Sequence, residues 1–181
     1  GTARFYTDFG LLSSDPELGE DLHRMFLQVA GLGVAPQMRT LIQAPFHLAD
    51  RMNDFIEEEI RAAESGQEAW IRARMNSLTD PGIIRTLYRA SQAGVKIELL
   101  VRGVCRLRPG LPGISENISV RSLVGRFLEH SRVFQFCAGG VGRAFFASAD
   151  WMERNLHRRV ELCVPLLHPP TRERVLHEGL E

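Results

Sequence analysis

Lysine is nearly missing from this sequence: Lys96 is the only one among 22 basic residues, and the others are arginine. The arginines could reflect a preference for bidentate binding of oxyanions, although drift in genome composition explains such a bias more simply. No charge is in excess either, because 22 acidic residues balance the basic ones. The composition therefore gives no general attraction to nucleic acid or to membranes, and any phosphate site must be a local cluster.

Cysteine is scarce too, and long apolar runs are absent. Cys105, Cys137 and Cys163 form no CxxC pair, which favours reduced thiols in a cytoplasmic protein. No run approaches the roughly 18 to 20 apolar residues of a membrane span, and no signal-peptide pattern opens the chain. A peripheral association with a membrane stays open. Because His, Cys, Asp and Glu never recur at metal-ligand spacing, we expect no metal site within this sequence.

What is present fits one globular α/β domain with an appendage. The 181 residues are 44% hydrophobic and 24% charged, as in an ordinary folded protein. Glycine and proline near residue 35 interrupt the apolar periodicity of helices and strands. We therefore place the main domain at 38–181, after a connector helix and linker at 14–37 and a short strand-like segment at 1–13. The absent initial methionine and the helical pattern at the last residues suggest an excised fragment.

The main domain alternates between strand and helix patterns. Strand patterns occur at 41–45, 69–75, 95–101, 117–122, 127–136, 143–150 and 158–166. Helical patterns occur at 49–65, 80–93 and 169–180. Right-handed crossovers would make the first three strands a parallel sheet with helices on its faces. Pro165 suits an outer strand, so the last strand is expected at the sheet edge.

Several polar side chains follow the expected strands at one rim of the sheet. Arg102 comes directly after the third strand, where open α/β sheets bind ligands. A guanidinium there could hold phosphate oxygens bidentately, although a surface salt bridge explains an isolated arginine equally well. Arg74 and Asn76 end the second strand at the same rim and are further candidates. Two more arginines, Arg106 and Arg108, occupy a Pro/Gly-rich loop that could form a flap over the site.

The pattern around His130 indicates phosphate chemistry most directly. His130 and Arg132 stand two residues apart in an expected strand, so their side chains would project from the same face. A hairpin turn would then return Ser148 and Asp150 beside them. An imidazole next to a guanidinium suits proton transfer and charge neutralisation at a phosphate. From the residues alone, the alternative is a histidine hydrogen-bonded to Glu129 or to a backbone carbonyl.

Four separated blocks resemble the C-terminal part of the bacterial polyphosphate kinase family, the ATP:polyphosphate phosphotransferases. They are LVRGVC at 100–105, PGISENI at 112–118, GRFLEHSR at 125–132 and SADWMERN at 148–155. The blocks match in order, and the resemblance runs from Thr2 to about Pro165. It implies an α/β fold, a phospholipase D-like mixed sheet flanked by helices on both faces. It also makes 1–13 the end of a preceding catalytic domain.

The resemblance implies roles for four residues. His130 would be the acid/base that opposes a phosphohistidine, and Tyr6, Arg102, His130 and Arg132 would bind ATP or its phosphates. The phosphohistidine and the Mg²⁺ ligands would lie upstream of this segment. The complete enzyme, expected to be a homo-oligomer, would move the terminal phosphate of ATP reversibly onto inorganic polyphosphate, whereas the isolated fragment would be inactive. Family members usually carry lysine at position 74, and no role is assigned to Arg126.

Two other classes of function stay open. A phospholipase or nuclease of the phospholipase D superfamily would also need two histidines, but would normally show His-x-Lys and Gly-Ser-x-Asn. Arg132 and the Ser148-Ala149-Asp150 run depart from that pattern. The second alternative is a non-catalytic module that binds a nucleotide or polyphosphate. Binding of ATP and polyphosphate to this chain, compared with turnover by the complete polypeptide, would separate these classes.

Overall fold

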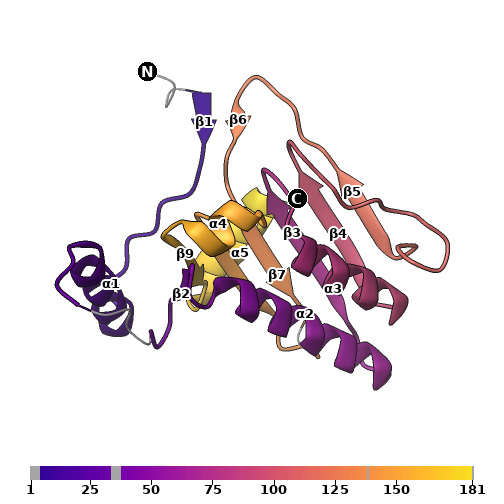
Figure 1. Cartoon of the computed structure of the whole chain (residues 1–181), viewed down its shortest axis with the longest axis horizontal. Coiled ribbons are helices and arrows are strands. Elements are labelled where there is room, and N and C mark those ends of the chain that lie inside the picture. The colour runs from indigo at the N-terminus through magenta and orange to yellow at the C-terminus, as the bar shows by residue number, and fades with distance from the viewer. Residues whose placement is uncertain (1–4, 34–37, 138, 181) are drawn as a thin grey trace.

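The computed structural model describes residues 5–33, 38–137 and 139–180. Its elements, in order, are β1 (Tyr6–Thr7), α1 (Pro16–Val29), β2 (Ile42–Ala44), α2 (Leu48–Glu64), β3 (Trp70–Met75), α3 (Pro81–Gln92), β4 (Lys96–Val101), β5 (Ile118–Arg121), β6 (Leu128–Glu129), β7 (Val133–Phe136), β8 (Arg143–Ala147), α4 (Glu153–Arg158), β9 (Glu161–Pro165) and α5 (Pro169–Leu180). Most strands form one sheet in the order β2-β9-β8-β7-β3-β4-β5, and β1 pairs with β6 in a separate small sheet (Figure 1).

The large sheet is mixed. β3, β4 and β5 are parallel neighbours, whereas every other adjacent pair is antiparallel. The prediction that the first three strands form a parallel sheet therefore holds for β3 and β4 but is wrong for β2, since β7, β8 and β9 separate β2 from β3. The later hairpin β7–β8 takes the free edge of β3, because antiparallel strands joined by a short turn pair without a crossover.

The predicted edge position of the last strand is also wrong. β9 pairs with β8 on one side and with β2 on the other. Pro165 is nevertheless tolerated, because the β2 register ends at Cys163 and leaves Pro165 opposite only Phe145 of β8. Its missing N–H therefore interrupts no pairing with β2.

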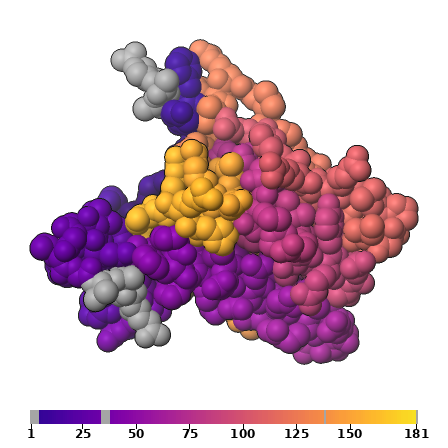
Figure 2. Space-filling model, viewed as in Figure 1, coloured from indigo at the N-terminus to yellow at the C-terminus, as the bar shows by residue number. Residues whose placement is uncertain are grey.

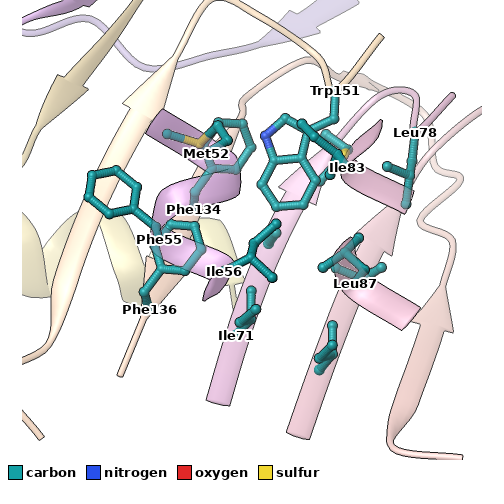
Figure 3. Close-up of a cluster of buried hydrophobic side chains, with 14 of the residues drawn as sticks. Met52, Phe55, Ile56, Ile71, Leu78, Ile83, Leu87, Phe134, Phe136 and Trp151 are labelled. Atoms are coloured by element: carbon teal, nitrogen blue, oxygen red, sulfur yellow. The ribbon is translucent and has the colours of Figure 1, made fainter. Parts of the chain in front are cut away.

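One face of the sheet is covered by α2 and α3, which enclose the larger core (Figure 3). Met52, Phe55 and Ile56 of α2 point inward, as predicted. Beneath them, the rings of Phe134 and Trp151 lie with centroids 4.9 Å apart. Each fully buried side chain of this size contributes about 1.5 to 3 kcal/mol. This core fixes the ends of β3 and β7, between which the polar residues described below converge.

The other face of the sheet is covered by α5. A second apolar cluster forms there, made of Val133, Ala144, Leu166, Val175 and Leu180. Side chains alternate along β3, so that its apolar residues face the larger core while Arg72 and Arg74 contact the C-terminal end of α5. Helices on both faces of a mixed sheet confirm the expected architecture.

α1 lies beside the domain instead of on the sheet (Figures 1 and 2). Asp15 caps it, accepting from the amide of Glu17 at 2.8 Å, as the sequence predicted. Of its apolar stripe, Leu18 is buried, whereas Phe26 and Val29 are exposed. Across the described ranges, we find no helix with both the length and the apolar character needed to cross a membrane.

Candidate active site

The strand expected at 127–136 is two strands in the structure. β6 ends at Glu129, β7 begins at Val133, and His130 lies in the link between them. The prediction of one continuous strand is wrong because β6 leaves the large sheet and pairs with β1 in parallel, with Tyr6 opposite Leu128. The backbone N–H of His130 extends this pairing by donating to the carbonyl of Thr7 at 3.0 Å.

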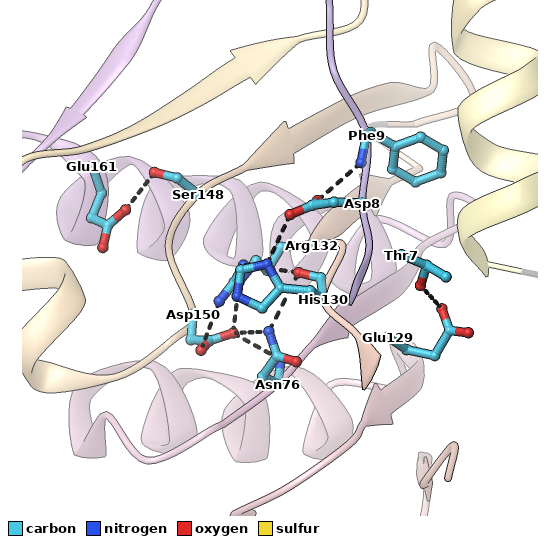
Figure 4. A network of polar contacts seen from close by, with 10 residues as sticks. All are labelled: Thr7, Asp8, Phe9, Asn76, Glu129, His130, Arg132, Ser148, Asp150 and Glu161. Atoms are coloured by element: carbon cyan, nitrogen blue, oxygen red, sulfur yellow. Dashed lines mark hydrogen bonds and ion pairs between the residues drawn. The ribbon is translucent and has the colours of Figure 1, made fainter. Parts of the chain in front are cut away.

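The pairing of β1 with β6 brings side chains of the N-terminal segment against His130 (Figure 4). Nδ1 of His130 lies 2.8 Å from Oδ2 of Asp8. The ring of Tyr6 meets the imidazole edge-on, with centroids 5.0 Å apart and an interplanar angle of 69°. The His130 side chain remains 35% exposed. The imidazole is thus held by its neighbours yet open to a ligand.

Arg132 lies against the ring, which confirms that the two side chains project together. Its NH1 nitrogen is 3.0 Å from Nδ1 and 3.2 Å from Nε2 of His130. Nearly equal distances place this nitrogen over the ring face, because an in-plane position between the two nitrogens would collide with Cε1. Among the described residues only Arg132 lies within hydrogen-bond distance of Nε2, so no hydrogen bond there takes up the in-plane direction of Nε2, which can serve a substrate proton.

A buried ion pair fixes Arg132. Its Nε donates to Oδ1 of Asp150 at 3.1 Å and NH2 donates to Oδ2 at 3.4 Å, while NH1 donates to the carbonyl of His130 at 2.8 Å. Asp150 also accepts from the backbone N–H of Asn76 at 2.8 Å. Separating the two partners of such a pair would leave each charge buried and unpaired, which is costly. This network therefore holds the guanidinium of Arg132 in one place.

Arg102 occupies a neighbouring pocket. It follows β4, as predicted, and its backbone N–H donates to the carbonyl of Met75 at 3.1 Å. The pocket has a volume of about 560 Å³ and is lined also by Phe5 and by residues 123–128, but it does not include His130. Nε of Arg102 is buried and has no hydrogen-bond partner in the described part of the chain. The structure thus brings Tyr6, His130 and Arg132 into contact. Arg102 lies apart from them, in a pocket that His130 does not line.

Comparison with known proteins supplies the family. Residues 41–178 match the family model described as polyphosphate kinase C-terminal domain 2. The chain belongs to the polyphosphate kinase family. It is 52% identical over 99% of its length to a polyphosphate kinase of Burkholderia vietnamiensis, and 55% identical over 92% to one of Pseudomonas aeruginosa. It spans 26% and 24% of those proteins, about a quarter of their length.

Solved structures agree with this family. The crystal structure of the polyphosphate kinase from Porphyromonas gingivalis matches with a TM-score of 0.87 at 38% identity, over 91% of this chain and 25% of that one. Nuc from Salmonella typhimurium, a phospholipase D family member, matches with a TM-score of 0.53 at 18% identity, over 76% of this chain and 88% of that one. The second likeness shows the fold alone, which is the phospholipase D-like fold that was expected.

Ser148 does not face His130, although the sequence predicted that it would. Its hydroxyl bonds the carboxylate of Glu161 and accepts from the backbone N–H of Leu162 at 3.0 Å. Asn155 donates to the same Glu161 at 3.0 Å. Ser148 is turned away because β8 continues to pair with β9 at this point. Only Asp150, two residues on, reaches Arg132.

The arginines of the flap candidate lie in a fixed loop. Arg106 donates its backbone N–H to Leu78 at 2.9 Å, and Arg108 donates its own to the hydroxyl of Tyr88 at 2.8 Å. Buried Ser115 bonds the carbonyl of Arg108 at 2.7 Å. With its backbone held at three points, this loop is not the free flap that its composition suggested. Both side chains are exposed.

Arg74 differs from the other candidates, because both of its terminal nitrogens already have partners in the protein. Its NH1 donates to the carbonyl of Gly179 at 3.1 Å, and its NH2 pairs with Oε2 of Glu129 at 2.5 Å. The side chain is 9% exposed. Arg126 is exposed beside Phe127 at the rim of the Arg102 pocket.

Sequence reasoning missed Asp8, which contacts His130, and Glu129, which contacts Arg74. The signal for Asp8 was its spacing, two residues after Tyr6, which puts both side chains on one side of an extended segment. Across the described ranges, no group of three or more His, Cys, Asp or Glu side chains is arranged to hold a metal ion. Burial raises the pKa of Cys105, Cys137 and Cys163, so these thiols are poor nucleophiles.

A second pocket contains none of the predicted site residues. It has a volume of about 600 Å³ and lies between the 38–42 segment, the first turns of α2, and β8. Its basic side chains have acidic neighbours, as in the pairing of Arg143 with Glu58. We therefore locate the candidate active site around His130 and not in this pocket.

Proposed function

We propose that this chain supplies the acid/base and phosphate-binding half of the polyphosphate kinase active site. The complete enzyme would transfer the terminal phosphate of ATP reversibly to inorganic polyphosphate, through a phosphohistidine in the upstream part of the polypeptide. The observation that carries the proposal is the setting of His130, with a carboxylate at Nδ1, a guanidinium over the ring face and an open in-plane direction at Nε2. Membership of the polyphosphate kinase family supports it.

His130 would move the proton at Nε2. With Nδ1–H donating to Asp8, Nε2 carries either a lone pair or a proton that points at the substrate. When the upstream histidine attacks the terminal phosphorus of ATP, Nε2–H would give its proton to the departing ADP oxygen. When polyphosphate then attacks the phosphohistidine, Nε2 would take a proton from the attacking terminal phosphate. General acid–base assistance of this kind contributes about 10²- to 10⁴-fold.

The cations would neutralise phosphate charge without covalent work, as phosphoryl transfer requires. Arg132 uses part of its donor fork on Asp150 and His130, and the remaining N–H groups of NH1 and NH2 would contact phosphate. The buried Nε of Arg102, which has no partner among the residues that the structure describes, and the apolar lining of its pocket suit the rest of the nucleotide. The hydroxyl of Tyr6, an exposed residue, would donate to a phosphate oxygen.

The residues around His130 do not by themselves fit a Mg²⁺ ion. Their carboxylates are already engaged, since Asp8 contacts His130 and Asp150 contacts Arg132 and Asn76. Mg²⁺ demands near-octahedral oxygen ligands. We propose that its ligands lie in the upstream part, and no step above is routed through the ion. ATP, ADP, polyphosphate and that upstream part are the proposed partners, in a homo-oligomer.

Turnover of the full-length enzyme tests the proposal. His130→Ala should lower kcat for polyphosphate synthesis from ATP by at least about 10²-fold, because the acid/base is lost. His157→Ala is the matched control, since His157 is another half-exposed histidine paired with an aspartate, Asp80, and lies outside the site. It should change kcat less than about twofold. Wild-type synthesis by His130→Ala would reject the proposed function.

A further inference from the structure

Arg74 joins the last helix to β6, the strand that ends directly before His130. It projects from β3 toward α5, where its guanidinium is almost fully buried. One nitrogen donates to the carbonyl of Gly179, in the last turn of α5. Another pairs with Glu129, the residue before His130. A single side chain thereby bridges two elements that share no backbone pairing.

Glu129 passes the connection on to β1. Its Oε2, which accepts from Arg74, also accepts from the hydroxyl of Thr7 at 2.5 Å (Figure 4). Thr7 and Glu129 are register partners in the β1–β6 pair, and each directly precedes a residue of the site, Asp8 and His130. The chain of contacts therefore runs from α5 through Arg74 and Glu129 to both strands that bring Asp8 against His130.

The β1–β6 pair depends on such a tether. It contains two residue pairs, Tyr6 with Leu128 and Thr7 with Glu129, and its place is outside the large sheet. Two short strands without further partners are marginal in water. The ion pair of Arg74 with Glu129 is mostly buried, with side chains 9% and 27% exposed, so it is screened by water less than a surface pair.

The last turn of α5 also packs directly beside this segment. A Cβ added at Gly179 would lie 3.4 Å from the ring of Phe9, the residue after Asp8. Phe9 belongs to the apolar cluster beneath α5. Thus the end of α5 contacts the β1 side of the site through Phe9 and the β6 side through Arg74.

We propose that Arg74 is a positioning residue, which couples the docking of α5 to the geometry of Asp8 and His130 through Glu129. This inference rests on the proposed function of His130. Both terminal nitrogens of Arg74 contact Gly179 or Glu129 and its side chain is 9% exposed, which favours a positioning role over direct binding of phosphate.

The test compares variants of the full-length enzyme in synthesis from ATP with a polyphosphate primer. Arg74→Met removes both contacts, and Glu129→Gln removes the charge of the partner while keeping an acceptor for Thr7. A misplacement of about 1 Å can cost up to 10²-fold in rate, so we expect each variant to lower kcat at least about tenfold. KM for ATP should change less than about threefold, because the nucleotide contacts remain. Arg74→Lys, which can reach one partner at a time, should recover part of kcat.

Arg72 provides the matched control. It stands two residues earlier on β3 and donates to the next α5 carbonyl, that of Leu180, at 3.2 Å, but it pairs with Glu98 instead of Glu129. Arg72→Met therefore loses a cap on α5 without breaking the link to His130, and kcat should change less than about twofold. The melting temperature of each variant is measured in parallel, to separate a loss of kcat from a loss of folding. If Arg74→Met fails to fold, Glu129→Gln remains informative, because Glu129 is partly exposed.

The decisive comparison is between the double variant and the two single variants, because it shows whether Arg74 and Glu129 act through the same link. The double variant Arg74→Met/Glu129→Gln should lose no more kcat than the more affected single variant, because both break the same link. The inference would be overturned if the fold-loss of kcat in the double variant equalled the product of the two single losses. It would also be overturned if Glu129→Gln had the same kcat as Arg72→Met. His130→Ala is measured beside them. An inactive His130→Ala with a fully active Glu129→Gln rejects only the role of Arg74, whereas an active His130→Ala rejects the proposed function itself.

Discussion

Asp8 and Arg132 together determine how the imidazole of His130 can act. Asp8 lies at Nδ1 and Arg132 over the ring face, so the in-plane direction of Nε2 remains for chemistry. The sequence predicted that His130 and Arg132 project together, because their spacing is local. The contact of His130 with Asp8 was missed, because Asp8 is 122 residues away in the chain and reaches His130 through the β1–β6 pairing.

Replacing Asp8 should therefore impair catalysis more than stability. In Asp8→Asn the amide can donate to Nδ1, which moves the imidazole proton to Nε2 and removes the base. We expect kcat of the full-length enzyme to fall about 10- to 10³-fold, with the melting temperature nearly unchanged because Asp8 is half-exposed. Asp54→Asn, at an exposed aspartate of α2 paired with Arg51, is the control. A wild-type kcat in Asp8→Asn would show that the carboxylate does not set the tautomer.

At the scale of elements, the docking of α5 depends on a glycine that packs against β7. A Cβ at Gly179 would lie 2.9 Å from Cγ2 of Val133, closer than real side chains approach. Gly179→Ala should then cost about 1 to 3 kcal/mol of the free energy of unfolding, as overpacking does. Urea denaturation of the 181-residue chain measures this cost. Gly19→Ala in α1, where a Cβ meets no atom within 4 Å, should instead be neutral or stabilise by up to about 1 kcal/mol. Equal stabilities of the two variants would contradict this packing.

The attachment of α1 depends on a buried carboxylate. Oxygens of Asp21 accept the backbone N–H groups of Arg39, Thr40 and Leu41, the last two at 2.7 and 3.0 Å. Burial acts to raise the pKa of Asp21, but these three donors outweigh it and hold the pKa below its ordinary value of 3.8.

This lowered pKa predicts a pH dependence with a definite sign. The ionised Asp21 stabilises the attachment fully above pH 3.8, and the contribution is lost as the pH falls through the lower folded pKa. Hydrogen exchange should show protected amides at Thr40 and Leu41 at pH 6 and weaker protection below pH 3.8. Asp21→Asn should reduce protection at pH 6 and flatten this dependence, unlike Glu20→Gln on the exposed side of α1. Protection that is independent of pH in the wild type would contradict the assignment.

Elements with a local signal could be predicted, and those set by distant partners could not. α2 and α3 followed from apolar periodicity and caps such as Asp80, which accepts from the amide of Ile83 at 2.9 Å. The break between β6 and β7 did not follow, because residues 127–136 are apolar enough for one strand. Only the pairing of Tyr6 with Leu128 draws β6 away from the sheet.

At the scale of the whole molecule, the α/β class was predictable, but the neighbour of each strand was not. Strand direction follows from connection length, whereas the distance between β2 and β3 depends on three later strands that enter the sheet between them. The separation of Arg102 from His130 has a similar origin, since residues 123–128 cross between β5 and β7 and line the Arg102 pocket.

The partial length of the chain has a functional consequence. It spans about a quarter of its polyphosphate kinase relatives, and the proposed two-histidine mechanism needs a second histidine from outside this chain. We therefore expect the 181-residue chain alone to show no ATP-dependent synthesis of polyphosphate, while the full-length enzyme does. Turnover measured at equal concentrations checks this, and synthesis by the isolated chain would contradict a phosphohistidine located elsewhere.

The central claim is that Nε2 of His130 faces the transferred phosphate while Asp8 holds Nδ1. A crystal structure of the full-length enzyme with a non-hydrolysable ATP analogue measures this directly. The account predicts a terminal phosphate oxygen within about 2.6 to 3.2 Å of Nε2, with the contact between Asp8 and Nδ1 preserved. A terminal phosphate bound beyond the reach of His130, or an imidazole turned so that Nε2 meets Asp8, would contradict it.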